Sequence, residues 1–258
     1  YYPLCLEVRD RLSCQPPNRI WHVQGSYTQD WLLHDTDFNW RVLAAEGGEL
    51  RALADIGTHW LDLVQFITQS RVTALCADLI QVHPTRRRPV HSTQTFAGTG
   101  PAATNEVPID TEDAGNVLLR FDSGAQGSLN VSQVMAGRKN CLRFEIAAAD
   151  EAFAWDSEHP NELWIGRREQ PNGSLLRDPS LLGPTARAAT SYPGGHNEGY
   201  PDTFKQLFRS VYDYVNAGDL TAERLFPTFA DGHREILLCE AMLTSHRERR
   251  WVDIPQTP

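Results

Sequence analysis

Asp55 and His59 are the two residues of this sequence whose types and spacing most directly suggest chemistry. They lie in the run GGELRALADIGTHWLDLVQFIT, residues 47–68, where a loop leads into a helix. Side chains four positions apart share one face of a helix, so a carboxylate and an imidazole could act on the same substrate group. The histidine would take or deliver a proton while the aspartate holds one tautomer and stabilises the imidazolium. The pair is therefore a candidate acid/base unit.

Two other interpretations fit the same pair. Aspartate is a favoured helix N-cap, so Asp55 would cap the helix and His59 would be a partly buried histidine one turn later. A metal site is the other alternative, since aspartate and histidine at this spacing can ligate zinc or iron. Such a site needs further ligands, and His34, His196 and Glu198 are available, although no spacing requires them. The residues alone leave all three interpretations open.

The elements that must position the pair are those of an α+β protein. Helical spacing of apolar residues predicts helices over residues 1–13, 55–68, 203–218 and 229–250. Alternation of apolar and polar residues predicts strands over 19–28, 71–82, 115–121, 127–134, 142–149, 151–157 and 162–167. This order predicts a large, mostly antiparallel open sheet with helices on one face.

The remaining segments have the composition of loops. Residues 29–54 and 168–198 show no regular period, and residues 83–113 are rich in Thr, Pro, Gly and Ser. We expect the last of these to be a long surface loop or a partly disordered segment. The only basic run, Arg86-Arg87-Arg88, lies in it between two prolines, and a solvated position is expected for its side chains.

Composition excludes several classes of function. The chain has 258 residues, of which 41% are hydrophobic and 22% charged, enough to bury a substantial core. No run of about 18 or more apolar residues exists, which argues against a transmembrane helix. A net charge of −9 argues against a nucleic-acid or anionic-membrane partner. The five cysteines are scattered and never spaced as C-x-x-C, which disfavours a disulfide framework and suits a reducing cytoplasm.

A dinucleotide site cannot be built from these residues. No G-x-G-x-x-G lies in a strand-to-helix setting, and Gly47-Gly48 and Gly194-Gly195 do not follow strands in the required way. The sequence begins with Tyr1 inside an amphipathic helix rather than with a methionine. We therefore expect the chain to be the remainder of a longer polypeptide.

The run GGELRALADIGTHWLDLVQF resembles the signature of the C-terminal domain of the Gfo/Idh/MocA oxidoreductases, which include glucose–fructose oxidoreductase and inositol dehydrogenase. Further segments resemble the family in family order: GSYTQDWLL at 25–33, FNWRV at 38–42, YPGGHNEGYPDTF at 192–204, and FPTFADGHREILLCEAML at 226–243 followed by RRWVDIP. Together they cover nearly the whole chain. Several motifs in order are far more specific than any one alone.

The resemblance implies that residues 1–258 form the substrate-binding and oligomerisation domain of a two-domain dehydrogenase. Residues 1–17 would be a remnant linking helix after the family's N-terminal Rossmann domain. That domain is missing, and with it the Glu-Lys-Pro segment whose lysine belongs to the family's catalytic set. The implied cofactor is NAD or NADP, the substrate is a carbohydrate or polyol, and no metal is implied. The family also forms homo-oligomers through the open sheet face, and a cytoplasmic protein is expected.

By motif position, Asp55 and His59 match the family's Asp-x-x-x-His. His59 would act as acid/base on the hydroxyl being oxidised, with Asp55 orienting it. An arginine guanidinium suits carbohydrate binding because it donates several hydrogen bonds, and an indole because it stacks on a sugar face. The residues expected to contact the substrate are Gln29, Trp31, Arg41 and His196.

Three functions follow from these observations. The first is the substrate part of a sugar or polyol dehydrogenase, inactive alone because no residue here holds the cofactor. The second is a non-catalytic carbohydrate-binding or oligomerisation module, which would show no redox activity even with a nucleotide-binding domain supplied. The third is a metal-dependent hydrolase or isomerase, which would be sensitive to chelators.

Overall fold

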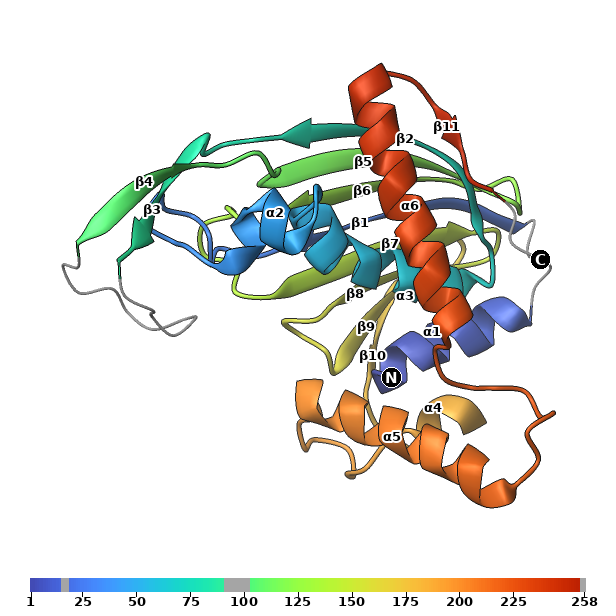
Figure 1. The fold of residues 1–258 in the computed structure, drawn as a ribbon. Helices are drawn as coiled ribbons and strands as arrows, with labels where there is room; N and C mark the ends of the chain where they lie inside the picture. The colour runs from blue at the N-terminus through green and yellow to red at the C-terminus, as the bar shows by residue number, and fades with distance from the viewer. Residues whose placement is uncertain (15–18, 91–102, 256–258) are drawn as a thin grey trace.

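The computed structural model describes residues 1–14, 19–90 and 103–255. Among these residues, nine strands form one sheet in the order β10-β9-β8-β7-β1-β6-β5-β2-β11 (Figure 1). Their bounds are β1 (Ile20–Thr28), β2 (Val72–Ile80), β5 (Ala114–Phe121), β6 (Gln126–Ser132), β7 (Cys141–Ala148), β8 (Ala152–Asp156), β9 (Glu162–Gly166), β10 (Gly173–Leu176) and β11 (Val252–Asp253). Seven of these strands lie where the sequence predicts strands, whereas β10 and β11 were not predicted. The α+β class is confirmed.

The first strand occupies the middle of this sheet. β1 pairs parallel with β6 and antiparallel with β7, while the other pairs of neighbours are antiparallel. Because β1 and β6 are parallel, with Thr28 opposite Ser132, their carboxyl ends meet at one edge. The residues that follow, Gln29 and Gln133, are thereby brought to the same place.

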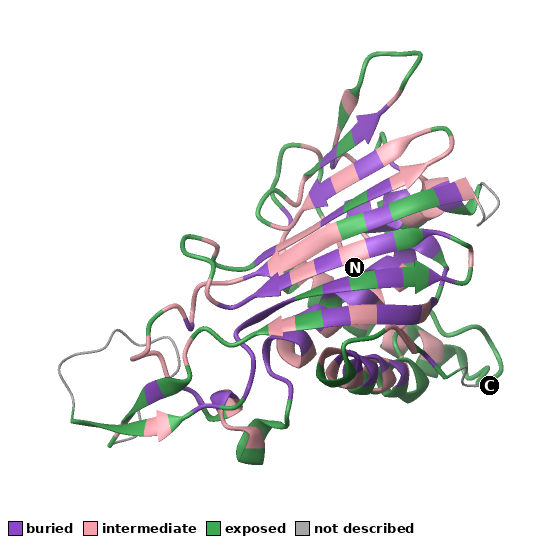
Figure 2. Ribbon diagram, turned by 90° about the horizontal axis from the view of Figure 1, so that it is seen from above, coloured by how far each residue is buried: buried purple, intermediate pink, exposed green. Residues whose placement is uncertain are grey.

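Helices cover one face of the sheet (Figure 1). They are α1 (Pro3–Ser13), α3 (Thr58–Thr68) and α6 (Phe229–Glu248). Alternate strand residues such as Val23 and Ile146 point into a core that includes Trp60, Val64 and Met242, each fully buried. Since strand side chains alternate, the intervening residues form an uncovered second face, which Figure 2 shows as stripes of exposed and intermediate residues.

Trp60 lies against the glycine of β1. A Cβ on Gly25 would overlap the Arg143 carbonyl oxygen and the Trp60 indole nitrogen. That nitrogen donates a hydrogen bond to the same carbonyl across 2.7 Å. The GSYTQDWLL motif therefore begins with a glycine because α3 packs closely on the sheet there.

The segment predicted as a long loop, residues 83–113, is ordered at both ends. β3 (Thr85–Pro89) and β4 (Thr104–Pro108) form a two-stranded arm beside the main sheet (Figure 1). Residues 91–102 lie outside the described part. The expected solvated position of Arg86 is wrong, because its guanidinium is fully buried against Asp113 and three backbone carbonyls. Burial of an arginine needs such partners, and the local sequence does not reveal them.

The other two predicted loops contain short elements. Residues 29–54 include η2 (Trp40–Val42) and α2 (Ala44–Gly47). Residues 168–198 include β10 and α4 (Pro184–Ala188). These pieces of three to five residues are too short to produce a readable period.

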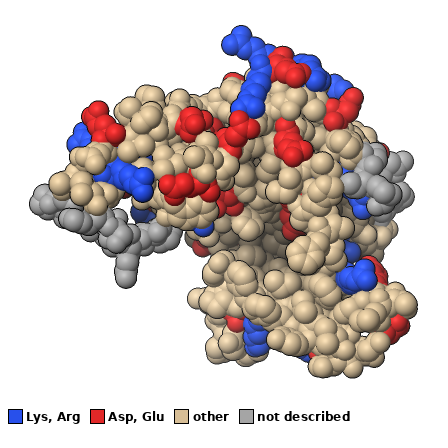
Figure 3. Space-filling model, in the orientation of Figure 1, with Lys and Arg blue, Asp and Glu red and all other residues tan. Residues whose placement is uncertain are grey.

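The helix α5 (Tyr200–Ala217) ends at Gly218, whose φ of 71° is the left-handed C-cap that the sequence predicts. Its apolar side is largely exposed, and Figure 3 shows few charges on the surface over it. Phe208, Tyr212 and Val215 keep more than half of their surface exposed. In the described residues, none of the helices has both the length and the apolar character needed to cross a membrane.

Candidate active site

Asp55 lies inside a helix rather than at its start. The backbone is helical from residue 52, and Leu53–Gly57, labelled η3, forms a π-helical turn that continues directly into α3. The interpretation of Asp55 as the N-cap is therefore wrong. Single π-turns within helices occur frequently at functional sites, because the wider turn changes the direction of its side chains.

A residue from a distant segment caps this helix instead. The Glu112 carboxylate accepts hydrogen bonds from the backbone amides of Arg51 (2.9 and 3.0 Å) and Leu53 (2.9 Å). These are amides that a helix start leaves without an internal partner. With the capping done by Glu112, the Asp55 carboxylate is free to face the site.

Two residues hold the Asp55 carboxylate. Gln133 Nε2 donates to Asp55 Oδ2 across 2.8 Å, and Arg41 Nε lies 3.5 Å from Oδ1. No hydrogen bond or ion pair within residues 1–14, 19–90 and 103–255 joins Asp55 to His59.

His59 is exposed and its ring faces Tyr27 of β1. The two ring centroids lie 6.2 Å apart with planes inclined at 56°. The Tyr27 hydroxyl donates to Asn140 Oδ1 across 2.7 Å, and burial raises its pKa. Tyr27 therefore stays a neutral hydrogen-bonding group near neutral pH, next to the exposed imidazole.

A chain of hydrogen bonds extends this wall to two predicted substrate residues. Gln29 Nε2 donates to the same Asn140 oxygen across 2.7 Å. Trp31 Nε1 in turn donates to Gln29 Oε1 across 2.8 Å. The side chains of Tyr27, Asn140, Gln29 and Trp31 thus form one polar and aromatic wall beside His59.

The structure does not join His196 to this group by any contact among the described residues. His196 is exposed in the loop that precedes α5. Arg177 fixes the loop by donating to the carbonyl oxygens of Tyr192, Pro193 and His196, and it forms a buried 2.8 Å ion pair with Glu198. The role of His196 stays a prediction.

Sequence reasoning missed three residues of the site: Tyr27, Gln133 and Asn140. Tyr27 was readable, because it lies in the GSYTQDWLL motif and shares a strand face with Val23 and Gly25. Gln133 and Asn140 carry no local signal. The place of Gln133 depends on the parallel pairing of β1 with β6, and that of Asn140 on the antiparallel pairing of β1 with β7, which join segments more than 100 residues apart.

In the described part of the chain, the side chains close enough together to bind a metal ion do not include Asp55 or His59. Among the described residues, the group whose ligand atoms lie within 4.8 Å of one another is Cys141, Asp156 and Glu158. Burial raises the pKa of Cys141 to about 11, and Asp156 already pairs with Arg143 at 2.8 Å. A neutral thiol and an occupied carboxylate are poor metal ligands.

Two hollows lie away from the pair. One, of about 770 Å³, lies between α1, α3, α6 and residues 223–227, and Asp62 and Glu235 are among its lining residues. The other, of about 850 Å³, lies on the open part of the sheet beside Arg143 and Trp164. Neither of these two hollows is lined by Asp55 or His59.

The fold is an open, mostly antiparallel sheet with helices on one face (Figure 1). The GFO/IDH/MocA C-terminal domain matches residues 7–154, and the chain belongs to that family.

Known relatives agree with this assignment. Levoglucosan dehydrogenase of Pseudarthrobacter phenanthrenivorans is 26% identical over 251 residues, which cover 92% of this chain and 60% of that protein. An oxidoreductase domain protein from Kribbella flavida has a TM-score of 0.84 at 27% identity, covering 99% of this chain and 64% of its own. The apo form of levoglucosan dehydrogenase has a TM-score of 0.84 at 25% identity, covering 100% of this chain and 65% of its own. The chain thus spans less than two thirds of the length of these relatives.

Proposed function

We propose that this chain is the substrate-binding part of a dehydrogenase that transfers a hydride between a sugar or polyol carbon and NAD or NADP. The observation that supports this proposal is the exposed His59 imidazole next to Tyr27 of a hydrogen-bonding, aromatic wall, one helical turn after an Asp55 carboxylate that Gln133 and Arg41 hold. Relatives of the same fold bind matching molecules: a levoglucosan dehydrogenase structure holds NADH and levoglucosan, with a TM-score of 0.82 at 24% identity over 99% of this chain and 64% of that one.

The protein residues handle the proton half of the reaction. As the carbon–hydrogen bond breaks and a carbonyl forms, the hydroxyl proton passes to a nitrogen of His59. A bound nicotinamide would supply the acceptor for the hydride and its electron pair. The Asp55 charge stabilises the imidazolium that results, and Gln133 and Arg41 keep that charge in place. The reverse reaction returns the proton from His59 to the carbonyl oxygen.

The wall fits a polyhydroxylated substrate. Trp31 offers an aromatic face, while Gln29, Asn140 and Tyr27 offer amide and hydroxyl groups. Arg41, with a side chain 40% exposed, adds a charged fork next to Asp55. Such a mixture binds sugar hydroxyls by hydrogen bonds and the ring face by stacking. Pyranoses and anhydrosugars are the first substrates to test, followed by inositols.

No glycine-rich dinucleotide motif occurs in the 258 residues. We therefore expect turnover only from the complete polypeptide that contains this chain, or when a nucleotide-binding domain is supplied.

Activity of the complete protein tests the proposal. Each sugar is incubated with NAD or NADP, and formation of the reduced nicotinamide is followed by its absorbance. We expect turnover with at least one sugar, and a loss of roughly 100-fold or more in kcat for His59→Ala, the range of general acid–base catalysis. The matched control is His233→Ala, at an exposed histidine of α6.

Unchanged turnover in His59→Ala would contradict the role of His59. Sugar binding without nicotinamide reduction in the unsubstituted protein would instead indicate a non-catalytic carbohydrate module.

We also propose that the protein forms homo-oligomers through the uncovered face of the sheet. Leu118 of β5 and Trp164 of β9 are 53% and 39% exposed there. Because β-strand side chains alternate, the buried neighbours Val117 and Leu119 place Leu118 on the face opposite the helices. Apolar exposure on a broad face is typical of an interface.

Light scattering after gel filtration tests the interface. Leu118→Glu is expected to give a smaller species than the unsubstituted protein. Leu220→Glu, at an exposed leucine between α5 and α6, is expected to change nothing. Equal masses for Leu118→Glu and the unsubstituted protein would exclude this face as the interface.

A further inference from the structure

Four charged residues form a buried cluster beneath the candidate site. They are Arg51, Arg86, Glu112 and Asp113, with exposed fractions of 2%, 0%, 5% and 0%. This set, called here the buried charge cluster, contains two guanidinium groups and two carboxyl groups. Groups of this kind are rarely buried completely unless they are paired and hydrogen-bonded.

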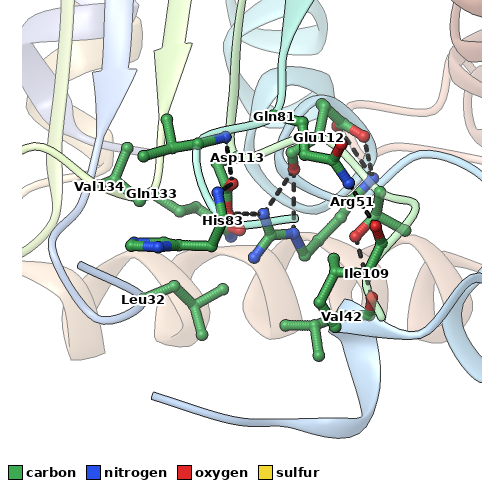
Figure 4. Close-up of polar contacts among 12 residues, drawn as sticks. Leu32, Val42, Arg51, Gln81, His83, Ile109, Glu112, Asp113, Gln133 and Val134 are labelled. Atoms are coloured by element: carbon green, nitrogen blue, oxygen red, sulfur yellow. Dashed lines mark hydrogen bonds and ion pairs between the residues drawn. The ribbon is translucent and has the colours of Figure 1, made fainter. Parts of the chain in front are cut away.

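Asp113 is the centre of the cluster. Its Oδ1 accepts hydrogen bonds from Arg51 Nη2 and, across 2.7 Å, from Arg86 Nη2. Its Oδ2 accepts from the backbone amides of Val82 (2.7 Å) and His83 (2.9 Å). The two arginines lower the pKa of Asp113 against the opposing effect of burial, so it stays charged. Figure 4 shows Asp113 with Arg51 and His83 around it.

Arg86 connects the cluster to the loop that follows β1. Its Nη2 donates to the carbonyl oxygen of Leu32 across 3.0 Å. Its Nη1 donates to the carbonyl oxygens of His34 (2.8 Å) and Asp37 (3.0 Å). Arg86 thus holds residues 32–37 at three backbone carbonyl oxygens. These residues lie between Trp31 and Arg41, two of the expected substrate contacts.

Arg51 and Glu112 connect the cluster to the helix of Asp55. The Glu112 carboxylate caps that helix through the amides of Arg51 and Leu53. The Arg51 guanidinium in turn donates hydrogen bonds to the carbonyl oxygen of Glu112 from Nε (3.0 Å) and Nη2 (2.7 Å). The segment that carries Asp55 therefore cannot shift independently of residues 112–113.

A third connection reaches Asp55 itself. The backbone amide of Gln133 donates to the Asp113 carbonyl oxygen across 3.0 Å. The Gln133 side chain then donates to the Asp55 carboxylate across 2.8 Å. Figure 4 shows Gln133 next to Asp113 on the same side of the site.

Stability alone does not account for this arrangement. Replacing buried ion pairs by well-packed apolar residues is often neutral or stabilising, since desolvation offsets much of the attraction. A planar guanidinium fork instead fixes directions and distances. The arginines of the cluster direct their donors to backbone carbonyls of two segments whose relative position sets the geometry of the site.

We propose that the buried charge cluster is a positioning device that holds residues 32–37 and the turn carrying Asp55 in a fixed relation, and so sets the affinity for the sugar. This inference rests on the proposed dehydrogenase function. The four residues do not touch the reacting atoms, so they are positioning residues.

Neighbouring arginines in β3 provide a matched test. Arg86 is fully buried, whereas Arg87 is 54% exposed and pairs with Asp35 on the surface. In the complete protein, Arg86→Met is expected to raise KM for the sugar roughly tenfold, because misplacement of a substrate-positioning group by about 1 Å can cost up to about 100-fold. KM for the nicotinamide cofactor is expected to stay unchanged, which a general loss of folding would not produce. Arg87→Met is expected to leave both KM values unchanged.

Hydrogen exchange measures the positioning without relying on turnover. Amides of residues 30–41 are expected to exchange faster in Arg86→Met than in Arg87→Met or the unsubstituted protein. If Arg86→Met does not fold, Arg86→Lys keeps the charge, loses the fork, and is expected to show smaller changes of the same kind.

Exchange and sugar KM equal to those of Arg87→Met would overturn the positioning role. Absence of turnover in the unsubstituted protein would overturn the proposed function instead, while the exchange comparison would still decide whether Arg86 holds the loop.

Discussion

Gln133 Nε2 donates a hydrogen bond to Asp55 Oδ2 across 2.8 Å, and Gln133 is itself fully buried. The contact joins the residue after β6 to the π-turn before α3. It holds Oδ2 of the Asp55 carboxylate, while Arg41 Nε lies 3.5 Å from Oδ1. Asp55 is therefore oriented by residues outside its own helix, and its position depends on the pairing of β1 with β6.

Removing this donor should lower the rate more than the affinity. For Gln133→Leu in the complete protein, we expect kcat to fall roughly tenfold with KM for the sugar little changed, because the charge that stabilises the imidazolium is no longer held in place. Steady-state kinetics measure both constants. Gln24→Leu is the control, since Gln24 is exposed and its amide donates to the exposed side chain of Glu145. A full kcat in Gln133→Leu would show that Asp55 needs no such support.

The sequence predicts the elements of the sheet and the helix of the site, but not the start of that helix. Alternation in β5 and β7 and the helical spacing of Trp60, Val64 and Ile67 are local properties, and the structure confirms them. The cap from Glu112 comes from about 60 positions away, so a local pattern assigned the cap to Asp55 instead.

The burial of Arg86, like the start of the helix, could not be predicted from the local sequence. Three arginines between prolines have the composition of a solvated loop, and only the first of the three is buried. Its burial depends on Asp113 and on carbonyl oxygens of residues 32–37, which are partners that no local window contains. The resemblance to family motifs, rather than a local pattern, favoured Asp55 and His59 as candidate residues.

The surroundings of Gly25 and Gly232 predict opposite effects of substitution by alanine. Gly25→Ala places a methyl group where the Arg143 carbonyl and the Trp60 indole nitrogen meet, so we expect a loss of roughly 1–3 kcal/mol in unfolding free energy. Gly232 lies within α6 with open space around it, so Gly232→Ala is expected to gain about 0.5–1 kcal/mol. Urea unfolding of both variants tests the pair. A stabilising Gly25→Ala would show that α3 can move away from the sheet.

The environment of the Glu235 side chain predicts that the free energy of unfolding depends on pH. Its Oε1 accepts a hydrogen bond from Gln65 across 3.1 Å, and its buried Oε2 has no hydrogen-bond partner among the described residues. Burial, followed by the nearby Asp62 charge, raises the pKa of Glu235 from 4.5 to about 8. The folded state therefore keeps this proton up to about pH 8, while the unfolded chain releases it near pH 4.5.

Because the folded state binds more protons between these values, the unfolding free energy should fall as pH rises from about 4.5 to about 8. Glu235→Gln mimics the protonated form, so it is expected to match the unsubstituted protein below pH 4.5 and exceed it at pH 8 by roughly 1–3 kcal/mol. Urea unfolding across this range measures the difference, with Glu240→Gln, at an exposed position of α6, as control. Parallel stability curves for Glu235→Gln and the unsubstituted protein would mean that Glu235 is charged when folded.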